Sequence, residues 1–287
     1  MFREGRGEVL KRLNEAVGRG SDVTCRHKPH ALVLSDIEGC LNFDPRTYDH
    51  EVLDALRRMN EAANWSNALP FLTLCTGRQA PFVDAFSAFL SVRLPIIFEG
   101  GCGLFFPTQP PGDRHIWHPR LSSERDSEYR QLEAVVIEIA EADEVRPSLG
   151  KGRLLTFHPA PGRNIDELLR RFYEGLAEKE IEAEVTRSAN AVDISLAGIS
   201  KGAAVKWLLD TIHDRGGPSF VSGQVVGVGD AVNDLSFLRV VGKSVVPANA
   251  ELTLKETVDD CSPYSDAKAV ADVAVQSIEE NLAAASE

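Results

Sequence analysis

A short apolar run that ends in two acids constrains the fold of this chain more than any other stretch. The run, ALVLSDIEGCL, occupies residues 31–41. β-Forming residues before Gly39 predict a buried strand that stops in a tight loop. The strand would carry Asp36 to its C-terminal end, where open parallel sheets bind their ligands. Because side chains alternate along an extended backbone, Asp36 and Glu38 could project toward the same side. Two close carboxylates can share a divalent cation, or divide into nucleophile and proton donor. Taken alone, the stretch is also compatible with a solvated turn whose Asp caps a helix.

Composition narrows the classes of protein that this chain can belong to. With 287 residues, 43% hydrophobic and 26% charged, it can form one large or two modest globular domains. The net charge of −12 argues against nucleic acid or an anionic membrane as the main partner. An anionic substrate would therefore need a local cation, either a bound metal ion or a placed lysine.

Cysteine usage and hydropathy indicate in which cellular compartment the protein is expected. The five cysteines are scattered and odd in number, with no CxxC pair, which predicts free thiols and a reducing cytoplasm. No apolar run approaches the roughly 20 residues that span a membrane, and we expect no membrane partner.

Strands and helices alternate along most of the chain. After the first strand, the pattern predicts helices at about 48–63, 81–90, 203–213, 235–240, 251–256 and 267–282, and strands at 70–75, 95–98, 224–228 and 243–246. This alternation is typical of an α/β fold with a doubly wound parallel sheet.

The alternation is interrupted between about residues 102 and 198. Here the pattern predicts short strands at 104–106, 116–117, 153–157, 184–186 and 192–195, and helices at about 123–142 and 164–178. We interpret residues 102–198 as an inserted α+β cap domain, and residues 30–101 and 199–287 as the core domain.

Residues 1–29 precede the first core strand as an N-terminal helical extension. Val9, Leu10, Leu13 and Val17 recur at helical spacing, and Gly18 and Gly20 end the pattern. We expect an amphipathic helix that packs on the body of the protein or on a second subunit, which would make a homodimer.

Four polar stretches occupy corresponding places in this pattern. They are Asp36 with Glu38, Thr76-Gly77-Arg78, Ser200-Lys201-Gly202, and the segment from Asp230 to Asp234. Three of them follow predicted parallel strands and would meet at one sheet edge. The remaining one, Ser200-Lys201-Gly202, opens a helix. Each has an ordinary structural interpretation as a turn, a helix cap or a solvated lysine.

Together, the order DxEGxL, TGR, SKG and GDxxND resembles the four motifs of the haloacid dehalogenase superfamily. The insert after the third strand resembles the C2-type cap of the Cof-like sugar-phosphate phosphatase branch. The resemblance covers roughly residues 31–275, and the last motif, in residues 229–238, is its most specific part.

The resemblance implies phosphoryl transfer through an aspartyl-phosphate, with Asp36 as nucleophile and Glu38 as acid and base. Mg²⁺, which prefers oxygen ligands, would be bound by the Asp36 carboxylate, the Glu38 backbone carbonyl and Asp230. Lys201 would place a positive charge between nucleophile and phosphate. Asn233 and Asp234 would hold metal-bound waters or orient Lys201.

The implied substrate is a small phosphorylated molecule that the cap encloses. Thr76 and the backbone N–H of Gly77 would donate to a phosphate oxygen, and Arg78 would contact phosphate or form a structural ion pair. The loop 187–190 precedes the last cap strand, so Arg187 and Asn190 are expected to face the substrate, with an ordinary hairpin turn as the alternative.

Two departures from the family pattern affect the predicted chemistry. Glu38 stands where most members have Asp, although the related enolase-phosphatases share Asp-Ile-Glu-Gly. Residues 99–101 are Glu-Gly-Gly, without the Asn that often follows the third-strand acid. The sequence predicts a Mg²⁺-dependent phosphomonoester hydrolase acting on a small phosphorylated metabolite, a sugar phosphate. A phosphomutase and a catalytically silent phosphate-binding or regulatory module remain as alternatives.

Overall fold

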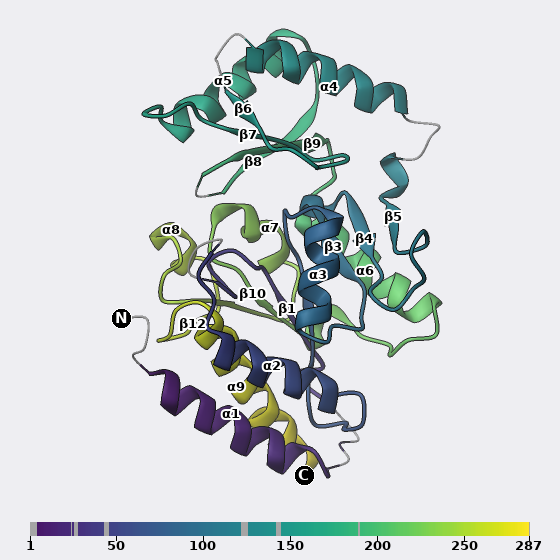
Figure 1. Ribbon diagram of the computed structural model, residues 1–287, viewed down its shortest axis with the longest axis vertical. Helices are drawn as coiled ribbons and strands as arrows, with labels where there is room; N and C mark the ends of the chain where they lie inside the picture. Colours follow the sequence, from purple (N-terminus) through teal and green to yellow (C-terminus); the bar gives the residue numbers. More distant parts are fainter. Residues whose placement is uncertain are drawn as a thin grey trace.

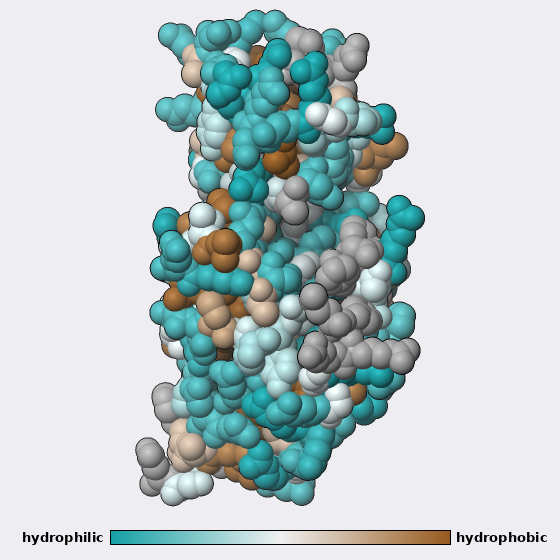
Figure 2. Space-filling view, turned by 90° about the vertical axis from the view of Figure 1, so that its left-hand side faces the viewer, coloured by the Kyte–Doolittle hydropathy of each residue, from teal (hydrophilic) through white to brown (hydrophobic). Residues whose placement is uncertain are grey.

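The computed structural model describes residues 5–23, 25, 28–42, 46–121, 126–141, 145–188 and 190–286. It has a lower part built around a parallel sheet and an upper part with a separate antiparallel sheet (Figure 1). On the face shown in Figure 2 the surface is mainly hydrophilic, with hydrophobic residues in small scattered groups. Within the described ranges, no helix combines the length and apolarity needed to cross a membrane.

The lower part is organised by a five-stranded parallel sheet. Its strands run in the order β12 (Asp260–Cys261), β11 (Lys243–Val246), β10 (Val225–Val228), β1 (Leu32–Ser35) and β2 (Phe71–Leu74). All four pairings are parallel. The central strands are buried on both faces, which explains why they are continuous apolar runs rather than alternating ones.

Helices cover both faces of this sheet, which confirms the predicted doubly wound α/β class. One apolar cluster joins the sheet to α1 (Arg6–Gly20), α2 (His50–Ala62), α3 (Ala80–Phe89) and α9 (Ala267–Ala285). A second cluster joins it to α6 (Lys201–Asp214), α7 (Leu235–Leu238) and α8 (Leu252–Lys255). The short 3₁₀ turn η4 (Ser222–Gln224) leads into β10.

The N-terminal helix α1 packs on the body of the protein. Val9 and Leu13 are fully buried in the cluster that includes α2 and α9, and Arg12 pairs with Asp272 of α9 at 2.8 Å. The helix ends at Gly20, where an added Cβ would lie 2.7 Å from Leu69. The structure therefore favours the first of the two predicted packing partners, the body of the protein.

The segment after β2 forms an antiparallel hairpin sheet. β3 (Ile96–Phe98) pairs with β4 (Gly103–Phe105), which pairs with β5 (His115–Trp117). β3 reaches the parallel sheet only through one bridge, between Cys75 and Ile97. The predicted boundary at residue 102 cuts this hairpin between β3 and β4, and Leu104 and Phe106 belong to the core cluster that includes α6. Strand pairing thus favours a boundary after β5, because backbone hydrogen bonds tie β4 and β5 to the core.

The upper part is a four-stranded antiparallel sheet under two helices. Its strand order is β6 (Arg146–Pro147), β7 (Leu155–His158), β9 (Val192–Leu196) and β8 (Ala183–Arg187). The helices α4 (Asp126–Glu141) and α5 (Ile165–Glu178) cover one face, and the other face is turned to the core (Figure 1). The predicted helix at 123–142 begins and ends on residues outside the described ranges. The two-residue strands β6 and β12 were not predicted, because they are too short to carry a periodic pattern.

Candidate active site

The loop after β1 carries Asp36 to the edge of the sheet that faces the cap. Asp36 N donates to Val228 O at 2.9 Å, so the parallel pairing with β10 extends as far as this residue. The backbone then turns, with Gly39 at φ +70°. An added Cβ at Gly39 would lie 2.0 Å from Asp230 Oδ2. Only glycine allows the two acidic loops to approach this closely.

Lys201 lies between Asp36 and Asp234. Its Nζ donates to Asp234 Oδ1 at 2.6 Å and lies 3.1 Å from Asp36 Oδ1, the latter an ion pair rather than an aligned hydrogen bond. All three side chains are buried. Burial by itself lowers the pKa of Lys201, but Asp234 and Asp36 outweigh it and hold that pKa well above the usual value. The lysine therefore keeps its charge at neutral pH.

Local structure explains why Lys201 occupies this place. It is the first residue of α6, and the preceding Ser200 caps the helix by accepting from Ala203 N. An added Cβ at Gly202 would lie 2.2 Å from Ser236 O. The start of α6 thus packs directly on the turn that holds the last acidic motif.

Asp234 is buried, and its side chain holds the backbone of the loop 230–234 in place. It ends the 3₁₀ turn η5 (Val232–Asp234), and its Oδ2 accepts from the backbone N–H groups of Asp230 and Ala231 at 2.9 and 3.1 Å. Both of its carboxylate oxygens are therefore engaged, one by Lys201 and one by the loop. The side chain of Asp230 is left available to a ligand.

The acidic cluster fits a hard divalent cation. One carboxylate oxygen from each of Asp36, Asp230 and Asp234 lies within 4.8 Å of the others. Buried Asp36 Oδ1 and Asn233 Oδ1 have no hydrogen-bond partner within the described part of the chain. Burial, with neighbouring carboxylates, raises the pKa of Asp36 and of Asp230 to about 8. A cation would compensate these charges, and oxygen donors are the ligands that Mg²⁺ prefers.

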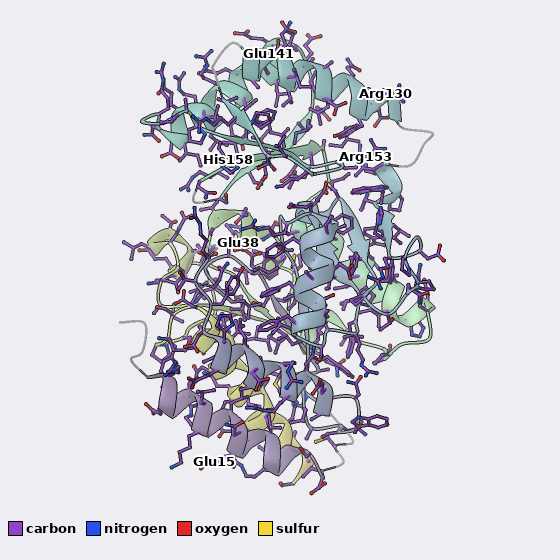
Figure 3. All side chains as sticks on the ribbon, in the orientation of Figure 1. Glu15, Glu38, Arg130, Glu141, Arg153 and His158 are labelled. Carbon is purple, nitrogen blue, oxygen red and sulfur yellow. The ribbon has the colours of Figure 1, made fainter. Side chains whose placement is uncertain are left out.

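Glu38 and Arg78 form a close ion pair at the same edge. Arg78 donates to Glu38 Oε1 from Nη2 at 2.6 Å and from Nε at 2.7 Å, and its guanidinium lies 4.7 Å from the centre of the Phe82 ring. Glu38 lies at the top of the core, below the cap that carries His158 and Arg153 (Figure 3). Of the two predicted interpretations of Arg78, the structure contains the ion pair. The side chain of Glu38 is turned to Arg78, so a metal contact through its backbone carbonyl stays a prediction.

The loop after β2 supplies one wall of a cavity between core and cap. Gly77 lines the cavity, whereas Thr76 is fully buried and its Oγ1 accepts from Arg78 N at 3.2 Å. From the core side, Lys201, Asn233 and Ser236 also line it. The space between these walls is about 350 Å³, part of it open to solvent.

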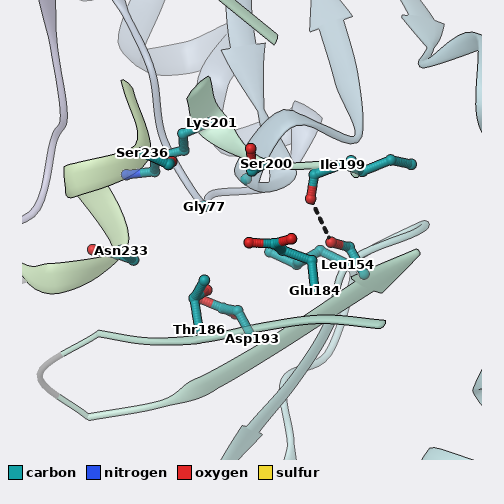
Figure 4. A pocket seen from close by; sticks show the side chains of 12 residues that line it. Gly77, Leu154, Glu184, Thr186, Asp193, Ile199, Ser200, Lys201, Asn233 and Ser236 are labelled. Carbon is teal, nitrogen blue, oxygen red and sulfur yellow. Dashed lines mark hydrogen bonds between the residues drawn. The ribbon is translucent and has the colours of Figure 1, made fainter. Parts of the chain in front are cut away.

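The cap sheet supplies the opposite wall (Figure 4). Glu184 and Thr186 of β8 and Asp193 and Ser195 of β9 line the cavity from the cap. A wall of acids and hydroxyls thus stands opposite the buried Lys201 and the acidic motif. The arrangement could hold a polar ligand with one end at Lys201, which lies beside Asp36.

Comparison with known proteins agrees with the fold. The family model described as haloacid dehalogenase-like hydrolase matches residues 160–273. Over these residues the chain resembles this family. Solved structures with this fold include sucrose-phosphatase from Synechocystis in complex with sucrose and phosphate, with a TM-score of 0.65 and 17% identity, covering 88% of this chain and 98% of that one. A putative HAD/COF-like hydrolase from Plasmodium vivax has a TM-score of 0.66 and 16% identity, covering 93% and 99%.

Curated relatives extend the similarity over most of this hydrolase. Phosphoglycolate phosphatase of Sulfolobus acidocaldarius is 26% identical over 242 residues, covering 83% of this chain and 92% of the relative. The phosphoglycolate phosphatase of Archaeoglobus fulgidus is 24% identical over 255 residues, covering 85% and 94%. The predicted resemblance to the haloacid dehalogenase superfamily is confirmed, and this hydrolase is an enzyme of the phosphatase class.

The two cap residues predicted from the loop 187–190 are not among the residues that line this cavity, and their contact with a substrate stays a prediction. Arg187 pairs with Glu251 at 3.1 Å and with Asp166 at 3.2 Å, so it links the cap to the core near α8. The carbonyl of Asn190 accepts from His158 Nδ1 at 2.9 Å, and Ala189 beside it lies outside the described residues. The prediction relied on position along the chain, whereas the cavity wall comes from the strands themselves.

Two features of the site were missed at the sequence level. The polar wall was signalled by the alternation Glu184-x-Thr186 and Asp193-x-Ser195, which puts polar side chains on one face of paired strands. The second feature is Glu99, which is buried and binds the cap loop. Its carboxylate accepts from the backbone N–H groups of Gly152, Arg153 and Leu154 at 2.8–3.1 Å.

Proposed function

We propose that this hydrolase is a Mg²⁺-dependent phosphomonoesterase that acts on a small phosphorylated metabolite through an aspartyl-phosphate on Asp36. The observation that carries the proposal is the buried arrangement of Asp36, Lys201 and Asp234 beside Asp230. Of these residues, Lys201 lines the cavity between core and cap.

Asp36 is the proposed nucleophile of the first step. A carboxylate oxygen of Asp36 attacks phosphorus, the bond from phosphorus to the leaving oxygen breaks, and protonated Glu38 gives its proton to that oxygen. In the second step water attacks the phosphorus of the aspartyl-phosphate, Glu38 accepts the proton, and inorganic phosphate leaves. Asp36 and Glu38 are thereby restored.

The other residues offset charge and position the phosphate. Lys201 places a compact cation next to the nucleophile. The N–H of Gly77 is the proposed donor to a phosphate oxygen. A bound Mg²⁺ would reduce the repulsion between the Asp36 carboxylate and the phosphate. Asp36 and Asp230 would hold it, with Asn233 and Asp234 behind them.

The likeness to sucrose-phosphatase supports a sugar phosphate as substrate, and the curated relatives support a smaller phosphorylated acid. A cytoplasmic location is supported by the cysteines, which are all free in the structure, four of them buried. A silent binding module is the second candidate, because Glu38 is held by Arg78 in this conformation.

The test is phosphate release from a panel of sugar phosphates, nucleotides and p-nitrophenyl phosphate, with Mg²⁺ and with EDTA. We expect Mg²⁺-dependent release by the wild type and its loss in Asp36→Asn. The exposed Asp210→Asn on α6 makes the same chemical change away from the cavity and should retain activity. Phosphate binding without release would favour the silent module, and isomerised sugar phosphates without free phosphate would favour a mutase.

A further inference from the structure

The cap wall of the cavity carries carboxylate oxygens that lack partners. Glu184 of β8 has no hydrogen-bond or ion-pair partner in the described portion of the chain, and its side chain is turned into the cavity (Figure 4). Asp193 of β9 is only 9% exposed. Its Oδ1 accepts from Thr156 Oγ1 and lies 3.4 Å from Lys151 Nζ, whereas Oδ2 points toward Gly77 without a described partner of its own. These oxygens can only accept hydrogen bonds.

Strand pairing makes these groups one patch. In the β8–β9 register Glu184 lies opposite Ser195, and Thr186 lies opposite Asp193. Each of these two neighbouring cross-strand pairs therefore joins one acidic residue to one hydroxyl residue. Ser195 Oγ already donates to Ile199 O at 2.8 Å, so it too can offer a lone pair to the cavity. The patch is a concave surface of hydrogen-bond acceptors.

Four basic side chains described above are already paired with carboxylates. Lys201 is held by Asp36 and Asp234. The other three pairs join Lys151 to Asp193, Arg78 to Glu38, and Arg187 to both Glu251 and Asp166. A second anionic group on the substrate, beyond its phosphate, would face the carboxylates of Glu184 and Asp193 and displace one of these pairs to gain a partner.

We infer that the cap of this hydrolase selects a leaving group rich in hydroxyl donors, a polyol or sugar, and rejects one that carries a carboxylate. This inference rests on the proposed phosphatase function and specifies its substrate class. It separates this chain from its curated phosphoglycolate relatives, whose named substrate carries a carboxylate. A carboxylate on the substrate would be repelled by the carboxylates of Glu184 and Asp193, whereas hydroxyl groups would donate hydrogen bonds to them.

A matched pair of substrates tests the inference. Glycerol 3-phosphate and 3-phosphoglycerate differ by the exchange of a hydroxymethyl group for a carboxylate. We expect kcat/KM to be at least about tenfold higher for glycerol 3-phosphate. Equal or better use of 3-phosphoglycerate would overturn the inference.

The variant Glu184→Gln removes one negative charge from the wall with little change of shape. We expect it to lower the preference for glycerol 3-phosphate by roughly fivefold, because repulsion of the carboxylate is relieved. Glu178→Gln on α5 makes the same change on an exposed part of the cap and should keep the wild-type ratio. An unchanged ratio in Glu184→Gln would contradict the role of this residue.

Two further measurements separate this inference from the proposed function. Hydrolysis of p-nitrophenyl phosphate, lost in Asp36→Asn, reports the core chemistry whatever the leaving-group preference. If no substrate is hydrolysed, calorimetric titration of the wild type with the same two ligands reads the preference from binding alone. Tighter binding of 3-phosphoglycerate there would overturn the inference as well.

Discussion

Glu38 and Arg78 show how one side chain sets the position of another. The two nitrogens of Arg78 that contact Glu38 Oε1 fix the carboxylate in one place, and the Phe82 ring supports the guanidinium. Glutamate is one methylene longer than the aspartate usual at this position, and the ion pair limits the extra freedom that this gives. We therefore assign Arg78 the role of positioning the proposed acid and base.

Removing that support should slow the chemistry more than it weakens binding. In Arg78→Met we expect kcat with p-nitrophenyl phosphate to fall by about tenfold or more, with a smaller change in KM, because Glu38 is no longer oriented. Arg78→Lys should restore part of kcat, since a cation near Glu38 remains. Arg58→Met on the exposed side of α2 serves as the control. A raised KM at constant kcat would instead make Arg78 a direct phosphate ligand.

Among the secondary-structure elements, the turn after β3 connects the two parts of the molecule. This 3₁₀ turn, η1 (Glu99–Gly101), begins with Glu99 at φ +47°, a conformation that costs energy in a residue other than glycine. The buried carboxylate of Glu99 accepts hydrogen bonds from three successive N–H groups of the cap loop between β6 and β7. Charge-assisted hydrogen bonds to backbone amides are strong, and here they hold the cap against the core.

Glu99→Gln should weaken this connection. The amide has one oxygen instead of two and turns an N–H₂ group toward backbone donors, so we expect a loss of about 2 kcal/mol in the free energy of unfolding. Urea denaturation measures it, and hydrogen exchange in residues 150–158 should become faster. Glu180→Gln is the matched control, because Glu180 also has a positive φ, +55°, but is exposed. Equal stability of both variants would show that the Glu99 contacts contribute little.

The molecule as a whole has a net charge of −12 and concentrates buried acids where core and cap meet. Burial raises the pKa of Asp36 and of Asp230 to about 8, well above the ordinary value of 3.8. Between these values the folded state holds more protons than the unfolded state. The stability of the metal-free protein should therefore fall as the pH rises from about 4 to about 8.

Mg²⁺ should reverse this trend, because it binds the ionised carboxylates. We expect the increase in Tm on adding Mg²⁺ to grow between pH 5.5 and pH 8.5, reaching about 4 °C or more at the higher pH. Thermal unfolding followed by circular dichroism, with EDTA as the reference, measures both curves. Asp230→Asn should flatten the pH dependence and remove most of the Mg²⁺ effect. An increase of the same size at both pH values would argue against a metal site made of these carboxylates.

The parallel core and the order of the chemical motifs follow from local patterns in the sequence. Strands β1, β2 and β10 are apolar runs that end in polar loops, and the carboxyl ends of parallel strands must meet at one edge. These patterns are therefore enough to predict that Asp36 and Asp230 come together. Glycines 39 and 202 belong to the same local signal, since side chains at these positions would block the approach of neighbouring loops.

Which cap residues lie opposite these motifs depends on how the cap packs on the core. Which face of β8 and β9 meets the core depends on how α4 and α5 cover the other face. For this reason Glu184 and Asp193 form the cavity wall, while Arg187 binds Glu251. The contact of Glu99 with residues 152–154 also joins positions more than fifty residues apart. Such contacts depend on packing between distant segments. The alternation in β8 and β9 indicates that these strands have a polar face, but it does not determine what that face meets.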